Sequence, residues 1–318
     1  MLYAYRAEDG KLIATEAGTA LWIDLCRPDA AEAAEIEPMV PGVPTLAEMS
    51  EIEISSRLYH EGATDVMTVM VPGLDRQDRT TPIIGPATFL LSPDRLVTVR
   101  YHEPRPFETY PGHAAQAPLG CGTPAKIFLG LIEEIIGRIA DLLEGAGHAL
   151  DEVTQRAFRG GAAGPDSGLL QMALETAGRQ SEMVGNCRLS LLSLERALGF
   201  FEVSLSELGI SEGLEGALHG LTRDIQSLEV HVDYLSSRIS QTIDATLGMI
   251  NLAQNNTVKI LSVVSVLFLP PTLIASIYGM NFHNMPEIGS PWGYAMSIVL
   301  MIASAVGAWA FFKWKNWL

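Results

Sequence analysis

Two uncharged apolar stretches lie close together near the C-terminal end of this 318-residue chain, at residues 260–277 and 292–312. As helices rising about 1.5 Å per residue, both are long enough to cross a hydrocarbon core of about 30 Å. We therefore predict two transmembrane helices, at about 258–278 and 291–312, joined by an outer loop at 279–290. The alternative, a helical hairpin buried in a soluble core, is disfavoured because core helices rarely run this long without a charge.

The positive charges that flank the two stretches predict their orientation. Lys259 precedes the first stretch, Lys313 and Lys315 follow the second, and no Lys or Arg lies between 260 and 312. Lys and Arg are retained on the cytoplasmic side of a membrane. We therefore expect a multi-pass protein with both termini in the cytoplasm. The N-terminus carries no basic segment followed by an apolar run, so no cleaved signal peptide is expected.

The rest of the chain is strongly acidic. Residues 1–256 hold 36 of the 37 acidic residues but only 18 of the 21 basic ones. This composition argues against nucleic acid as a partner, because phosphate binding depends on clustered Lys and Arg. The acidic body either concentrates cations near a pore mouth or only keeps a soluble domain dispersed, and both interpretations stay open. The three cysteines show no paired spacing and fit a reducing compartment.

Before the apolar stretches, the sequence changes character near residue 123. We predict an α/β domain over 1–122, a helical stalk domain over 123–257 and a transmembrane domain over 258–318. In the first domain, β-type runs bounded by turn residues predict strands at 21–25, 66–71, 88–91 and 96–100. Helical patterns lie at 28–36 and 46–58, and the stretch 104–124, rich in Pro and Gly, is interpreted as a linker.

Three long helices are predicted from residue 123 onward. The first begins at the cap Thr123-Pro124 and ends near 159, and the second covers about 169–208. Ser211 is expected to cap the third, which shows no break from 212 to 277 and would be about 100 Å long. It is interpreted as a stalk that continues into the bilayer, with a break near Gly248 as the competing possibility.

A polar stripe follows this third helix from the stalk into the first apolar stretch. Alternate steps of four and three residues keep one helix face turned toward a common axis. The residues reached by those steps are Asp244, Gly248, Asn251, Asn255, Val258, Ser262, Ser265, Leu269 and Thr272. Because polar groups facing lipid are unfavourable, we expect several copies of the chain to enclose a water-filled pore with these faces. Alternatively, Ser262, Ser265 and Thr272 are contacts between packed membrane helices.

Short motifs around the loop resemble the CorA family of divalent-cation channels. Tyr278-Gly279-Met280-Asn281 matches the signature tripeptide of that family with its usual preceding Tyr, and Met285-Pro286-Glu287 matches the start of its outer loop. The segments 254–256, 268–272 and 315–318 are also similar. The resemblance implies an α+β cytosolic domain with α/β/α layers, a very long helical stalk and two C-terminal transmembrane helices. It further implies a funnel-shaped homopentamer in a bacterial-type inner membrane.

The resemblance also assigns roles to residues. It implies a selectivity site made by Gly279, Met280 and Asn281, which would bind Mg²⁺ through its hydration shell. Further along the pore, polar rings would lie at Thr272, Asn255 and Asp244. Asn251 and Ser265 would also line the pore. Hydrophobic constrictions would be formed by Leu269 with Val258 or Leu261. In the outer loop, His283 stands where the family often has an acidic residue, and Glu287 follows.

The resemblance implies Mg²⁺ and Co²⁺ as transported ions, with Ni²⁺ and Zn²⁺ as possible further ones. Intracellular Mg²⁺ is expected to act as a regulator. Asp224 and Asp233 on the stalk are the candidate regulatory ligands, or else solvated surface charges. Two competing functions stay open: zinc uptake, as in the related ZntB branch, and a membrane-anchored metal sensor that does not conduct. Neither an enzyme nor a resident cofactor is expected. The G-x-S-x-G pattern around Ser211 lacks the preceding strand that a nucleophile needs.

Overall fold

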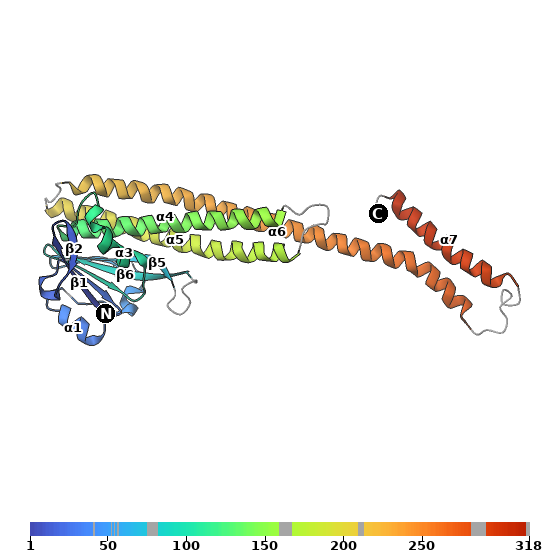
Figure 1. Cartoon of the computed structure of the whole chain (residues 1–318), viewed down its shortest axis with the longest axis horizontal. Helices are drawn as coiled ribbons and strands as arrows, with labels where there is room; N and C mark the ends of the chain where they lie inside the picture. The colour runs from blue at the N-terminus through green and yellow to red at the C-terminus, as the bar shows by residue number, and fades with distance from the viewer. Residues whose placement is uncertain are drawn as a thin grey trace. The chain divides into compact units, whose positions relative to one another are not determined.

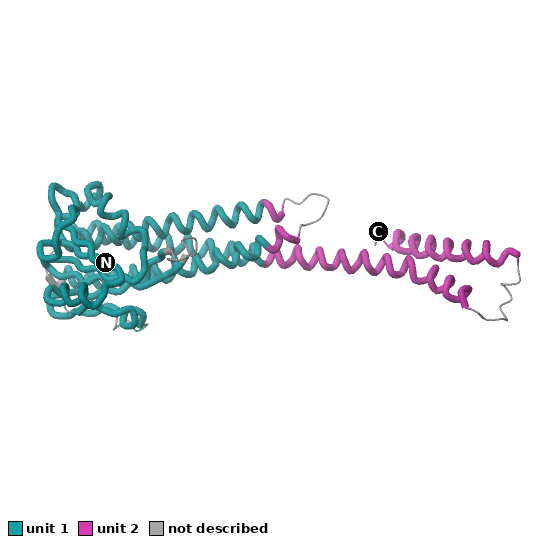
Figure 2. Tube along the Cα trace, turned by 60° about the horizontal axis from the view of Figure 1, so that its bottom comes forward, with its two compact units in different colours: residues 1–155, 172–243 teal, residues 156–171, 244–318 magenta. Residues whose placement is uncertain are grey.

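The structure is a computed structural model that describes residues 1–40, 42–51, 53, 55, 57–74, 82–158, 167–208, 213–280 and 291–315. Two compact units make up the chain (Figure 2). Unit 1 contains residues 1–155 and 172–243, and unit 2 contains residues 156–171 and 244–318.

A seven-stranded mixed sheet organises the N-terminal part of unit 1. Its order is β2-β1-β3-β7-β6-β5-β4. The central pair, β3 and β7, is parallel and the other pairs are antiparallel. Every residue of β3 and β7 is buried, as expected for strands covered on both faces. The strands are β1 Leu2–Glu8, β2 Lys11–Ala14, β3 Trp22–Cys26, β4 Leu58–Glu61, β5 Thr64–Leu74, β6 Pro82–Leu91 and β7 Leu96–Arg100.

Helices cover both faces of this sheet and confirm the predicted α/β/α layers. On one face, Ile36 of α1 (Ala30–Ile36) and Met49 of α2 (Leu46–Met49) join a core with Ile23, Leu25 and Val97. On the other face, a larger core joins the sheet to α3 (Arg105–His113), α4 (Pro124–Phe158), α5 (Ser167–Leu208) and the first part of α6 (Leu214–Tyr278) (Figure 1). The described residues of this domain also include the 3₁₀ turns η1 Ala17–Thr19 and η3 Ala114–Gln116.

The predicted linker at 104–124 is wrong, because it contains α3 and η3. Pro106 is tolerated because it lies in the first turn of α3, where a helix needs no amide hydrogen. Phe107 and Tyr110 then bury their rings against the sheet and α4: Phe107 lies 6.0 Å from Phe89, and Tyr110 lies 5.8 Å from Trp22 between ring centroids. The Pro and Gly content of the segment hid this packing.

The structure contains three strands that were not predicted, and one predicted helix ends earlier than expected. The prediction missed β1, β2 and β4. The turn that joins β1 to β2 is Asp9-Gly10, and both residues have positive φ values of 51° and 75°, as a tight hairpin turn of this kind requires. The helix predicted at 46–58 is α2, which begins with a Thr45 capping box but ends at Met49, and Leu58 already belongs to β4.

The longest helix, α6, is continuous over 65 residues and passes Gly248, Pro270 and Pro271 without ending. A break near Gly248 is therefore excluded. In unit 1, its residues Leu221, Ile225 and Leu235 pack into the core shared with α4 and α5. Ser211 and Glu212, expected at its start, lie outside the described residues.

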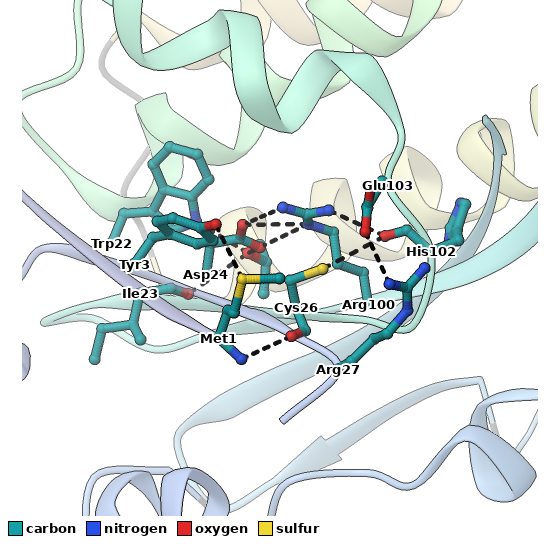
Figure 3. A network of polar contacts seen from close by, with 11 residues as sticks. Met1, Tyr3, Trp22, Ile23, Asp24, Cys26, Arg27, Arg100, His102 and Glu103 are labelled. Carbon is teal, nitrogen blue, oxygen red and sulfur yellow. Dashed lines mark hydrogen bonds and ion pairs between the residues drawn. The ribbon is translucent and has the colours of Figure 1, made fainter. Parts of the chain in front are cut away.

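A buried ion pair ties the two central strands together (Figure 3). Arg100 donates from Nη2 to Asp24 Oδ2 over 2.8 Å, and the two side chains are only 4% and 3% exposed. Thr98 donates to Asp24 Oδ1 over 2.8 Å, and the indole of Trp22 donates to Thr98 over 3.1 Å. The guanidinium also lies 5.2 Å from the centre of the Phe107 ring. The pair therefore connects β3, β7 and α3.

Replacing Arg100 alone should destabilise the protein strongly, because Asp24 would stay buried without its partner. We expect Arg100→Met to lower the free energy of unfolding by about 3–5 kcal/mol. The double variant Asp24→Leu/Arg100→Met should recover much of that loss, since no charge is left buried. Urea unfolding of the full-length protein in detergent measures both. A double variant no more stable than Arg100→Met would contradict this account.

His102 is a second buried polar group next to the ion pair. Its Nε2 donates to the Val71 carbonyl over 2.9 Å, while its Nδ1 has no hydrogen-bond partner among the described residues. The ring packs against Gly85, where an added Cβ would lie 2.7 Å from Nδ1. Burial, more than any neighbouring charge, lowers the pKa of His102 from 6.5 to about 4. The folded protein therefore holds this imidazole neutral.

The stability of unit 1 should fall in acid for this reason. Because the folded pKa of His102 lies below the unfolded value, unfolding takes up a proton between pH 6.5 and about 4, and the stability present above pH 6.5 is lost across that window. We expect His102→Gln to flatten this part of the pH dependence, measured by thermal unfolding from pH 7 to pH 4. The matched control, His148→Gln on the exposed side of α4, should leave the slope unchanged.

Candidate pore-lining helix

The chain contains two helices that are long and apolar enough to cross a membrane among the residues described, α6 and α7 (Gly293–Trp314). Only 6% of the apolar window of α6 and 11% of that of α7 is buried within the chain. A hairpin buried in a soluble core would show the opposite pattern. Leu261, Phe268 and Leu269 are 65%, 63% and 70% exposed, so lipid or other copies of the chain must cover them.

In unit 2, α7 runs beside the last part of α6 (Figures 1 and 2). The less exposed residues of each helix recur every three or four positions and mark one face. On α6 they are Lys259, Val263, Leu267, Pro270, Pro271, Ile274 and Tyr278. On α7 they are Gly293, Ser297, Ile298, Met301, Ser304, Ala305, Ala308 and Phe312. The α7 face is rich in small residues, which allow close approach of membrane helices.

The predicted polar stripe lies on the other side of α6. Ser265, Leu269 and Thr272 are placed about 120–180° around the helix from the buried Val263, at 3.6 residues per turn. All the residues predicted to line a pore are exposed within the chain: Asp244, Asn251, Asn255, Val258, Leu261, Ser265, Leu269 and Thr272. The face shared with α7 therefore leaves this stripe free. Its role as a pore lining stays a prediction.

The hydroxyl groups of this stripe are bonded to their own helix. Ser262 donates to the Val258 carbonyl over 2.8 Å, Ser265 to Leu261 over 2.8 Å and Thr272 to Phe268 over 2.6 Å. Each hydroxyl hydrogen is thus used inside the helix, and the oxygen lone pairs remain directed outward as acceptors. Such a surface accepts hydrogen bonds from water, including the hydration water of a cation.

The predicted selectivity residues lie where α6 ends. The Gly279 amide donates to the Ala275 carbonyl over 2.9 Å and the Met280 amide to Ile277 over 3.3 Å, and both residues are exposed. Asn281 lies outside the described residues, as do His283 and Glu287 of the outer loop.

The two aspartates predicted as regulatory ligands are not brought together. Asp233 forms an ion pair with Arg188 of α5. Asp224 is exposed, and its charge contributes, after burial, to raising the pKa of Glu133 on α4. Within the described part of the chain, no group of three or more His, Cys, Asp or Glu side chains is placed to hold a metal ion. A regulatory role for Asp224 and Asp233 stays a prediction.

Comparison with known proteins identifies the family. The family described as CorA-like Mg²⁺ transporter protein matches residues 17–314. Proteins named magnesium transport protein CorA from Yersinia pseudotuberculosis and Pasteurella multocida are 34% and 32% identical over 327 and 325 residues, covering all of both chains in each case. This chain belongs to the CorA family. The full CorA structure from Methanocaldococcus jannaschii, at 16% identity, covers 100% of this chain and 99% of its own with a TM-score of 0.74, which shows the same fold.

The resemblance seen in the sequence to the CorA family is therefore confirmed, as is its fold. What the sequence did not reveal is a cleft between α3 and α4, lined in part by Arg105, Tyr110 and Glu133. The segment that forms one wall of this cleft was interpreted as a linker. A signal was nevertheless present, because Pro106, Phe107 and Tyr110 give the spacing of an amphipathic helix with Pro in its first turn.

The two faces of α6 should differ in their accessibility to water. The native Cys26, Cys121 and Cys187 are all buried, so a new exposed cysteine can be followed against a low background. In membranes, we expect Ser265→Cys to react rapidly with a charged, water-soluble thiol reagent, because it belongs to the face that is predicted to line a water-filled pore. The matched variant Val263→Cys, on the α7 face, should react much more slowly. Equal rates for the two would show that the stripe does not face water.

Proposed function

We propose that this CorA family member is a homo-oligomeric channel, a pentamer, through which hydrated Mg²⁺ enters the cell, with α6 lining the pore and α7 outside it. The observation that carries the proposal is the exposed stripe of α6, which points away from α7 and carries outward-directed oxygen atoms. A chain with two membrane helices cannot enclose water alone. Several copies can, and this also removes the polar stripe from lipid.

In the proposed channel, selectivity comes from the end of α6. Asn281, with the backbone of Gly279 and Met280, would form a ring of uncharged oxygen atoms at the outer mouth. Mg²⁺ loses its water reluctantly, so neutral amide and carbonyl groups suit binding through the hydration shell. The relatives named as magnesium transport proteins favour Mg²⁺ as the main ion. Co²⁺ and Ni²⁺ have the same charge, and we propose that they share the path.

Below the filter, the pore would alternate between polar and apolar rings. Thr272, Asn255 and Asp244 supply polar rings, and Leu269 with Val258 or Leu261 supplies constrictions that close by excluding water. Intracellular Mg²⁺ acting on the cytosolic units would favour the closed state.

We propose that the protein lies in a bacterial inner membrane with both termini in the cytoplasm, as the flanking Lys259, Lys313 and Lys315 indicate. The acidic residues concentrated in 1–256 then face the cytosol. There they cannot attract ions from outside, but they hold divalent cations near the inner mouth, where regulation takes place.

Asn281→Ala should abolish Mg²⁺ uptake while leaving the oligomer intact, because it removes the amide ring from the filter. The matched control is Asn284→Ala, in the same loop, which should conduct normally. Uptake is measured with purified protein in sealed liposomes containing a Mg²⁺ indicator, and the oligomer by its mass in detergent.

The same liposomes separate the competing functions. A sensor that does not conduct would show no flux in the unaltered protein. A zinc transporter would take up Zn²⁺ in preference to Mg²⁺ when the two ions compete at equal concentration. Mg²⁺ uptake unchanged by Asn281→Ala would count against the proposed filter.

A further inference from the structure

Two pairs of apolar side chains lie exposed on the stalk helices of unit 1. The α6 pair is Val230 and Tyr234, which are 71% and 56% exposed. The α5 pair is Leu189 and Leu192, which are 52% and 38% exposed. Large apolar side chains that are grouped on a surface mark sites of association. Both pairs stand in the strongly acidic part of the chain, where charged side chains would be the ordinary surface residues.

Each pair points away from the core of its own chain. Both members of the α6 pair are two residues away from Val232, which is 1% exposed and packs into the core shared with α4 and α5. At 3.6 residues per turn, two residues correspond to about 160° around a helix, which is nearly the opposite side. The buried Leu191 and Leu194 stand in the same relation to the α5 pair. The described residues of the chain therefore leave both pairs uncovered.

The two pairs lie at the same level of the stalk, where α5 and α6 run side by side (Figure 1). Arg188 on α5 forms an ion pair with Asp233 on α6, and its Nη2 lies 3.5 Å from the Ser236 hydroxyl. Further along α5, Glu195 comes close to Glu229: burial raises the pKa of Glu229, and the charge of Glu195 raises it further. The α5 pair lies between these two arginine and glutamate positions on α5. The α6 pair lies beside the residues that they contact.

A ring of identical copies brings two such pairs together. Rotation about an axis along the stalk keeps every residue at its own level. Each copy then turns one flank to the copy before it and a different flank to the copy after it, which is the heterologous contact that closes a ring. Two different apolar pairs at one level suit this contact, whereas a two-fold dimer needs a single self-complementary surface.

The α5 surface also has room for a bulky neighbour. Gly185 lies one turn before Leu189 on the same side of α5, and it is exposed. No described atom lies within 4 Å of where a Cβ of Gly185 would be. The surface beside the α5 pair is therefore low enough to receive an aromatic ring such as that of Tyr234.

We propose that the α6 pair of each copy packs against the α5 pair of the next copy, so that the stalks form a closed ring in the cytosol. This inference rests on the proposed homo-oligomer and names the surfaces that hold it together outside the membrane. Removing the four side chains from water drives the contact. The helix α5 is tied to the sheet, because the Met70 amide of β5 donates to the Ser193 hydroxyl over 2.9 Å. The contact therefore couples the sheet of one copy to α6 of its neighbour.

Cysteine cross-linking of the full-length protein in membranes tests the contact. Since Cys26, Cys121 and Cys187 are buried, cross-links report on the added cysteines. We expect the double variant Leu192→Cys/Tyr234→Cys to give, on oxidation, a ladder of covalent species that reaches the whole oligomer. The single variants Leu192→Cys and Tyr234→Cys should remain single chains, because a heterologous contact joins two different surfaces.

The matched control is Met172→Cys/Tyr234→Cys. Met172 is also an exposed apolar residue of α5, but it lies about 30 Å along the helix from Leu192. It is therefore at a different level from Tyr234, and this variant should form no ladder.

The mass of the unaltered protein in detergent is measured alongside. An oligomer whose double variant forms no ladder would overturn this contact and leave the proposed channel untouched. A mass of one chain would overturn both. Cross-linking of Tyr234→Cys alone would also overturn the contact, because it would place the Tyr234 side chains of all copies around the central axis.

Discussion

The structure depends on one helix whose residues meet two different surroundings. As far as Thr246, α6 buries a regular apolar face, with Leu235 1% and Ile239 3% exposed. Beyond it most side chains of the same helix are exposed, apart from those on the face toward α7. An unbroken helix satisfies its own backbone hydrogen bonds, and this is what allows a chain to pass from water into lipid. The helix continues past Pro270 and Pro271, although neither has an amide hydrogen to donate to the carbonyl one turn earlier.

The polar stripe of α6 favours the proposed association of several copies of the chain. Lipid can cover Phe268 and Leu261, but it offers no hydrogen-bond partner to the polar groups of the stripe that lie within the predicted membrane span. The serine and threonine hydroxyls are a milder case, because each already donates to its own helix. Packing against α7 is no solution, since α7 contacts the opposite side. In the proposed oligomer, copies of the chain turn these faces toward each other and toward water.

The long helices and the two apolar stretches could be predicted from the sequence, because their signals are local and repeated. The run of eighteen uncharged residues after Lys259 can be recognised without knowing which residues it contacts. The same holds for the stripe reached from Asp244 by alternate steps of four and three residues. The misses share another cause. The helix α3 is held by Phe107 and Tyr110 packing on residues far away in sequence, and its composition suggests a loop. The Asp9-Gly10 turn could be predicted from its residue types. The short strand β2 beside it has only one buried side chain, so its sequence shows little of the alternation that marks a strand. The cleft depends on α3 and was missed with it.

The chemistry of the α6 stripe suits the task that is proposed for it. Along the α6 stripe, every oxygen from Thr272 to Asn251 is neutral, and the first carboxylate is Asp244. Neutral ligands bind a hydrated ion weakly enough to release it, which conduction needs.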